Sequence, residues 1–177
     1  MTRRHDPERR QRIIDAAIRV VGEKGIAGLT HRTVAAAADV PLGSTTYHFA
    51  TLDELLVAAL RQSNERFANT LAERLPEDGR GDLAADLAQV MGEWLGGDRT
   101  GVELEYELYL AALRRPALRP VAAEWTEDAG ACLARHTDPL TARALLAAMD
   151  GIFLQVLLTG GSYDEEYTRT VLARLIR

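Results

Sequence analysis

The side chains best suited to chemistry lie between residues 42 and 48, where the sequence runs Leu-Gly-Ser-Thr-Thr-Tyr-His. Hydroxyl groups, a phenol and an imidazole follow one another on what should be a short helix. Such groups donate and accept hydrogen bonds at base edges and at phosphates. This composition is unusually polar for a short helix, and Phe49, directly after it, should pack inward. We therefore expect an exposed helix suited to a nucleic-acid surface.

Two preceding helices must position that segment. A helix over about residues 6–25 should begin with Pro7, whose ring suits the first helical turn, and it carries an apolar stripe at helical spacing. A second helix, starting after Thr30 and running to about Ala38, is rich in alanine, and small residues let the next helix cross closely. Pro41 disfavours a helical residue before it and so ends this helix. The first 50 residues predict a three-helix unit containing a helix-turn-helix.

The rest of the chain has almost no strand signal and many helix-start signals. Thr51-x-x-Glu54 is a capping box that should open a long connecting helix over residues 51–76. We predict an all-α fold of about nine helices, with one domain over 1–50 and a second over 51–177. The remaining helices are expected over residues 83–95, 100–115, 120–136, 138–159 and 162–176, with starts at Thr100-x-x-Glu103, Asp138-Pro139 and Ser162-x-x-Glu165.

Charge is distributed unevenly. Residues 1–50 hold eight Arg and Lys against five Asp and Glu, a net charge of +3, and because the whole chain carries -5, the other residues carry -8. A basic N-terminal segment followed by an acidic remainder is typical of a protein whose N-terminal segment binds a polyanion. Cys132 is the only cysteine, which favours a reducing cytoplasm and excludes an internal disulfide. We expect no signal peptide, and we interpret residues 140–158 as too polar to span a bilayer.

The stretch from about Pro7 to Leu56 resembles the TetR family of bacterial regulators. The resemblance rests on Gly25-Ile26-x-x-Leu29-Thr30, on the helix-turn-helix after it, and on Tyr47-His48-Phe49 followed by Asp53-Glu54-Leu55. It implies a ligand-responsive regulator, most often a repressor, that binds a palindromic DNA operator as a homodimer. The residues that the resemblance implies for DNA contact are Arg3, Arg4, Thr30, His31, Arg32, Leu42, Gly43, Ser44, Thr45, Thr46, Tyr47 and His48.

Two positions depart from the pattern of that family. Thr46 stands where a tyrosine is frequent, and Leu52 stands where many members have a lysine near the start of the connecting helix. Loss of that lysine removes one phosphate contact, so affinity would depend more on Arg32 and on the N-terminal arginines.

The resemblance also implies a small-molecule effector bound inside the C-terminal domain. The candidate lining residues come from four predicted helices, although residues of these types more often fill a core than bind a ligand. Glu103, Glu105 and Glu107 could select a cationic ligand or simply form a solvated face. The candidate effector-binding residues are Met91, Trp94, Tyr106, Tyr109, Leu110, Trp125, Met149 and Phe153.

The last two predicted helices should form the homodimer contact. The helix over 138–159 is apolar nearly all round, which favours burial on more than one side, and Gly151 would permit close helix approach. The alternative is an ordinary core helix of a monomer. The candidate interface residues are Leu140, Ala144, Ala147, Ala148, Gly151, Gln155, Tyr167, Val171 and Leu175.

Two other classes of function are alternatives to a regulator. An enzyme is disfavoured because the four histidines lack metal-ligand spacing and because no Gly-x-Ser-x-Gly elbow or glycine-rich phosphate loop occurs, so no metal and no cofactor is expected. The protein could instead be an interaction module that kept the helix-turn-helix but lost DNA binding. This alternative stays open because residues 1–50 carry a net charge of only +3.

Overall fold

The computed structural model describes residues 8–75, 81–97 and 99–176, and in these residues it contains helices and no strand. The expectation of an all-α fold is confirmed. Arg3 and Arg4 lie outside the described residues, as do Asp6 and Pro7. The α-helices are α1 (Arg9–Lys24), α2 (His31–Ala37), α3 (Leu42–His48), α4 (Leu52–Arg74), α5 (Leu83–Gly97), α6 (Arg99–Ala111), α7 (Arg119–Leu133), α8 (Pro139–Thr159) and α9 (Glu165–Leu175), and the 3-10 turns are η1 (Ile26–Gly28) and η2 (Pro116–Leu118).

The chain forms two compact units. The head unit consists of the described residues up to Gln62 together with Leu104–Ala122, and the body unit consists of Ser63–Glu103 and Ala123–Arg177, as far as they are described. The units therefore do not divide at residue 50, where we expected the domains to divide. Helices α4, α6 and α7 each contribute residues to both units.

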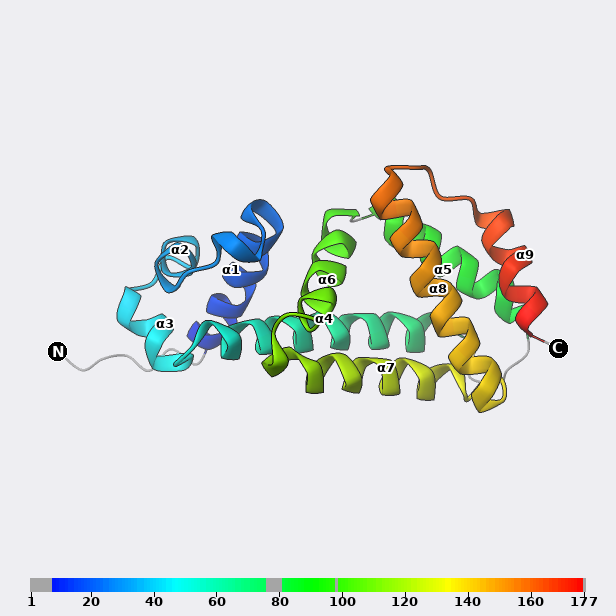
Figure 1. Cartoon of the computed structure of the whole chain (residues 1–177), viewed down its shortest axis with the longest axis horizontal. Helices are drawn as coiled ribbons and strands as arrows, with labels where there is room; N and C mark the ends of the chain where they lie inside the picture. Colours follow the sequence, from blue (N-terminus) through cyan, green and yellow to red (C-terminus); the bar gives the residue numbers. More distant parts are fainter. Residues whose placement is uncertain (1–7, 76–80, 98, 177) are drawn as a thin grey trace. The chain divides into compact units, whose positions relative to one another are not determined.

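The head unit is built on one apolar core to which residues from distant parts of the sequence contribute. Ile13, Val34 and Leu56 are buried in it, and so are Leu104 and Leu108 of α6. Burial of the α6 leucines explains why the second half of this helix belongs with the head, since removing apolar surface from water is the main stabilising term in folding. In Figure 1, α1, α2 and α3 form a compact group.

Local signals fix the helix ends of the head. Thr30 caps α2: its hydroxyl accepts the N–H of Thr33 at 3.0 Å, and the Thr33 hydroxyl accepts the N–H of Thr30 at 2.9 Å. Gly25 ends α1 with a φ of 67°, a conformation that glycine adopts without steric cost. Thr51 accepts the N–H of Glu54 at 3.1 Å, so the capping prediction at α4 is confirmed. Asp39 takes the left-handed conformation, with a φ of 52°, in the turn between α2 and α3.

The body unit is held by apolar packing and by polar contacts of α9 with α5. The Tyr163 hydroxyl donates to the carbonyl of Ala88 at 2.6 Å, and burial raises the pKa of that phenol, so it remains a donor. Arg169 of α9 forms an ion pair with Asp82, the residue before α5, at 2.9 Å. Figure 1 shows α5, α8 and α9 close together.

Two capping predictions in the body were wrong. Helix α6 begins at Arg99, so Thr100 lies inside the helix, and Glu103 instead pairs with the Arg99 guanidinium at 3.2 Å. Helix α9 is capped by Asp164, which accepts the N–H of Tyr167 at 2.9 Å, and not by Ser162. The cap that we expected from Asp138 and Pro139 at α8 is confirmed.

Among the described helices, α8 is long and apolar enough to cross a membrane by length and composition, with a mean hydropathy of 1.5 over the best 18 residues. The interpretation of this segment as too polar was therefore wrong on composition. Core helices of soluble proteins pass the same test, and one such helix is weak evidence. Here α8 buries Leu145, Met149 and Phe153 within the body unit.

Candidate nucleic-acid interface and effector site

The predicted contact helix α3 is exposed along one face. Tyr47 is 84% exposed and Leu42 is 46% exposed, and Gly43 and Thr46 also lie at the surface. Ser44 and His48 are half-buried. Phe49 is buried, as expected, and the Arg10 guanidinium lies 5.1 Å from the centre of its ring. The sequence therefore located the exposed face correctly.

Thr45 was wrongly included among the residues available to DNA. Its side chain is fully buried, and its hydroxyl donates to the carbonyl of Leu42 at 2.7 Å. On a short helix a residue can point inward beside an exposed neighbour such as Thr46, because successive residues are rotated by about 100°. A hydroxyl that is buried and already bonded cannot contact a base, so the role of Thr45 is to hold α3 on the head.

Three other predicted contact residues lie at the start of α2, a helix that packs against α3. Arg32 is exposed on α2, His31 is half-buried at the helix start, and Thr30 is exposed and engaged in the cap. Arg10, which was not among the predicted contact residues, adds a positive charge beside Phe49 at the end of α3. The only signal for it was the basic run around Arg9 and Arg12.

The body unit contains a cluster of four aromatic rings, each from a different helix. Phe67 of α4 stacks on Trp94 of α5, with ring centroids 4.5 Å apart and planes 16° apart. Trp125 of α7 meets Phe67 edge-on at 5.4 Å, and Phe153 of α8 meets Trp94 edge-on at 6.3 Å. Three of the four, Trp94, Trp125 and Phe153, were predicted as effector contacts, whereas Phe67 was not.

The other predicted effector residues divide between the two units. Met91 and Met149 are buried in the body. Tyr106, Tyr109 and Leu110 belong to the head, where Tyr109 packs partly buried against the core and Leu110 is 40% exposed. The sequence therefore predicted that aromatic side chains gather in the body. It was wrong to place Tyr106 and Tyr109 among them, because both belong to the head unit.

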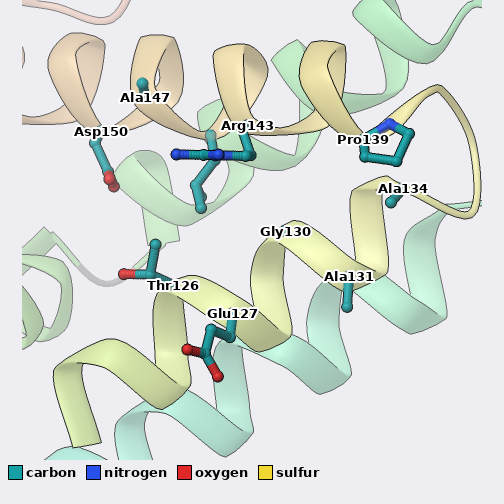
Figure 2. A pocket seen from close by; sticks show the side chains of 10 residues that line it. Thr126, Glu127, Gly130, Ala131, Ala134, Pro139, Arg143, Ala147 and Asp150 are labelled. Carbon is teal, nitrogen blue, oxygen red and sulfur yellow. The ribbon is translucent and has the colours of Figure 1, made fainter. Parts of the chain in front are cut away.

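A groove of about 610 Å³ lies between α7 and α8 in the body. None of the predicted effector residues lines it. In Figure 2, Asp150 on α8 and Thr126 on α7 point into the space between the two helices, and Arg143 on α8 and Glu127 on α7 also line the groove. The remaining lining residues are small or apolar: Gly130, Ala131, Ala134, Pro139, Leu146 and Ala147.

The predicted homodimer residues leave an unburied face on α8 and α9. Leu140 is 76% exposed and Tyr167 is 55% exposed, and a side-chain carbon added at Gly151 would meet no atom within 4 Å. Leu158, 82% exposed, was not among the predicted residues. Ala147 and Gln155 are exposed, while Ala144, Ala148, Gly151, Val171 and Leu175 are half-buried.

Comparison with known proteins agrees with this geometry. Residues 13–59 match the model for bacterial regulatory proteins of the tetR family, and residues 78–177 match the tetracyclin repressor-like C-terminal domain. The chain is 75% identical to the multidrug binding protein EbrR complexed with ethidium, with a TM-score of 0.90 and coverage of 96% of this chain and 99% of that one. It is 76% identical to a TetR family member from Streptomyces coelicolor A3, with a TM-score of 0.89 and coverage of 97% and 99%.

A more distant relative has a named effector. The nicotine-responsive transcriptional repressor HdnoR of Paenarthrobacter nicotinovorans is 28% identical over 163 residues, which is 84% of this chain and 83% of that protein. The two family models together match residues 13–59, which include the helix-turn-helix, and residues 78–177, and the solved structures superpose over nearly the entire chain. The chain belongs to the TetR family of ligand-responsive, DNA-binding transcriptional regulators.

Proposed function

We propose that this protein is a homodimeric repressor that binds a palindromic operator through α3 and releases it when a planar aromatic cation binds in the body. The observation that carries the DNA part is the exposed, polar face of α3. Exposed side chains with hydroxyl and imidazole groups can reach base edges in the major groove, and the start of α2 with Arg32 can bind a phosphate. The proposed DNA contacts are the residues predicted from the sequence, without Thr45.

The homodimer follows from what a single α3 can recognise. One short helix covers few base pairs, whereas two helices related by symmetry bind half-sites separated by roughly one turn of DNA, about 34–36 Å. The face of α8 and α9 supports this assembly, because Leu140 and Leu158 are large apolar side chains left in water. Large apolar side chains left exposed on one helix are consistent with an interaction site. Two copies of α8 and α9 would form a four-helix bundle.

The aromatic cluster is the proposed effector site. Phe67, Trp94, Trp125 and Phe153 present ring faces and edges from four helices, and ring faces attract cations. The similar protein EbrR has been crystallised with ethidium, malachite green and proflavin, all of them aromatic cations. A flat cation entering this site would separate the stacked rings of Phe67 and Trp94 and move the helices that carry them.

The groove between α7 and α8 is the second candidate location for the effector. Its carboxylates Glu127 and Asp150 would suit a cation, but it offers no aromatic ring. The two locations are distinguished by substitution, because Trp94→Leu should weaken ethidium binding at the aromatic cluster and Asp150→Asn should weaken binding in the groove.

The experiment that tests the DNA proposal is a gel shift and footprint on the upstream region of the protein's own gene. We expect a sequence-selective, salt-sensitive footprint with two-fold symmetry that ethidium abolishes. A regulator of this kind would act in the bacterial cytoplasm and without catalysis. A protein that gives no selective shift at low salt would instead be the interaction module that lost DNA binding.

A further inference from the structure

The loop between α6 and α7, residues 112–118, belongs to the head unit. Leu118 is buried in the head core, and its N–H donates to the carbonyl of Arg115 at 3.0 Å. In the helix before the loop, the Glu107 carboxylate accepts the backbone N–H of Ile26 at 2.8 Å. The loop is therefore held in place by contacts within the head, although it lies far from the helix-turn-helix in the sequence.

One ion pair joins this loop to the start of α4. The Arg115 guanidinium lies 2.6 Å from the Asp53 carboxylate. Asp53 lies in the first turn of α4, and only residues 49–51 separate α4 from the DNA-contact helix α3. The loop therefore lies beside the end of α4 that leads to α3.

The first turn of α4 would oppose a DNA phosphate if it stood alone. It carries the carboxylates of Asp53 and Glu54, of which Glu54 accepts the N–H of Ala50 at 2.8 Å. Leu52 stands where the resemblance to the TetR family leads us to expect a lysine. Because like charges repel, two carboxylates without a nearby cation disfavour the approach of the DNA backbone. A cation from elsewhere in the head is needed to reverse this effect.

The α6–α7 loop and the first residue of α7 bring three arginines beside these two carboxylates. Arg115 is half-buried and paired with Asp53, and the Arg119 guanidinium donates to the carbonyl of Ala112 at 3.3 Å. Arg114 is exposed, and among the residues that the structure describes its guanidinium has no hydrogen-bond or ion-pair partner. Positive charge is therefore in excess at this place, and Arg114 has its whole guanidinium available for another anion.

We propose that the α6–α7 loop is a second contact of the head with the DNA backbone, in which Arg114 binds a phosphate beside the half-site that α3 contacts. The inference rests on the proposed operator binding and adds a contact outside the helix-turn-helix. Guanidinium groups bind phosphate oxygens through two N–H groups at once and without regard to base sequence. Arg114 supplies the phosphate contact that Leu52 cannot make. Arg115 is a positioning residue, since its pair with Asp53 fixes the loop at the start of α4.

The test compares the wild type with Arg114→Gln, Arg114→Lys and Arg66→Gln. Glutamine removes the charge at position 114 and lysine keeps it, and Arg66, an exposed arginine of α4 in the body unit, is the matched control. Each protein is titrated by fluorescence anisotropy, at several salt concentrations, against the operator duplex from the footprint and against a random duplex of the same length. The slope of log affinity against log salt measures how many phosphates the protein neutralises. Circular dichroism melts check that each variant folds.

We expect Arg114→Gln to weaken binding to both duplexes by roughly three- to thirty-fold at low salt, with an unchanged preference for the operator. The salt slope should become shallower by about two, one for each copy in the homodimer. Arg114→Lys should keep the slope, and Arg66→Gln should match the wild type. Arg115→Gln should weaken binding in the wild-type background but much less in the Arg114→Gln background, because Arg115 acts through Arg114.

Equal affinities and slopes of Arg114→Gln and the wild type would overturn this contact and leave selective operator binding by the wild type in place. A folded Arg114→Gln that loses affinity with an unchanged slope would overturn it too, because loss of a phosphate contact must change the number of counterions released. Equal effects of Arg115→Gln in the two backgrounds would overturn the positioning role of Arg115. A wild type that binds both duplexes equally would overturn the proposed function and this inference together.

Discussion

The ring of Phe67 lies stacked on the indole of Trp94, with ring centroids 4.5 Å apart. These residues come from α4 and α5, and no spacing in the sequence relates them. A stacked pair of rings is worth about 0.5–1.5 kcal/mol beyond its area burial. A flat aromatic cation can replace one ring as the stacking partner of the other, so the loss of the pair is offset by new contacts of the same kind.

Replacing Trp94 with leucine should therefore weaken ethidium binding at least about five-fold, because the ligand loses one aromatic face. Quenching of the remaining Trp125, or fluorescence of ethidium itself, would measure the affinity. Asp150→Asn is the control, since Asp150 lines the groove between α7 and α8 and belongs to no aromatic pair. A larger effect of Asp150→Asn than of Trp94→Leu would move the effector site to that groove.

Thr45→Val should destabilise the head without changing its DNA preference. The substitution keeps the shape of the side chain but removes the hydroxyl that donates to Leu42, at a cost of about 1 kcal/mol. Urea unfolding would measure that loss. In contrast, Ser44→Ala should alter which operator sequences are selected and leave stability nearly unchanged. An altered sequence preference in Thr45→Val at unchanged stability would contradict the burial of Thr45.

The stability of the body should fall in acid through two carboxylates. The hydrogen bond from Arg169 holds the pKa of Asp82 below its ordinary value of 3.8, and hydrogen bonds from Thr141 do the same for Asp138. Because these pKa values are lower in the folded state than in the unfolded state, the stabilisation is complete above the unfolded value and is lost as pH falls through the folded one.

Thermal melts below about pH 4 would reveal this loss. Asp138→Asn keeps an oxygen that can cap α8 but cannot titrate, so its melting temperature should fall less with acid than that of the wild type. Asp128→Asn, an exposed residue of α7, is the control and should follow the wild type. Identical acid profiles for Asp138→Asn and the wild type would exclude a contribution from this cap.

Leu158→Glu should separate the proposed homodimer into monomers. Leu158 is 82% exposed on α8, and a buried, unpaired carboxylate at an interface is strongly unfavourable. Light scattering after size exclusion would give the mass in solution. Leu113→Glu places the same charge on a 71% exposed leucine of the head and should leave the mass unchanged. A wild type that is monomeric at micromolar concentration would rule out this interface.

The sequence predicted the features that depend on near neighbours along the chain. The exposed Tyr47, the inward Phe49 and the capping box at Thr51 follow from local patterns, and the structure confirms them. The errors at Thr100 and Ser162 have a local cause too, because a better capping residue or an earlier helix start lay close by.

Features that depend on distant partners could not be predicted. Glu107 and Ile26 are 81 residues apart, and the sequence offered Glu107 only as a possible cation ligand or as part of a solvated face. Leu104 and Leu108 joined the head core although they lie far beyond residue 50. Helical periodicity says which residues of a helix are buried, but not which other element buries them.

Operator binding by the wild type and by Tyr47→Ala tests the central claim most directly. Fluorescence anisotropy with a labelled duplex from the footprint should give two chains per operator and an affinity that falls as salt rises. Tyr47→Ala should bind roughly ten-fold more weakly, since each of two copies loses about one hydrogen bond, while Leu113→Ala should bind as the wild type does. Binding by one chain per duplex, or equal affinities of Tyr47→Ala and the wild type, would contradict recognition of DNA by a pair of exposed α3 helices.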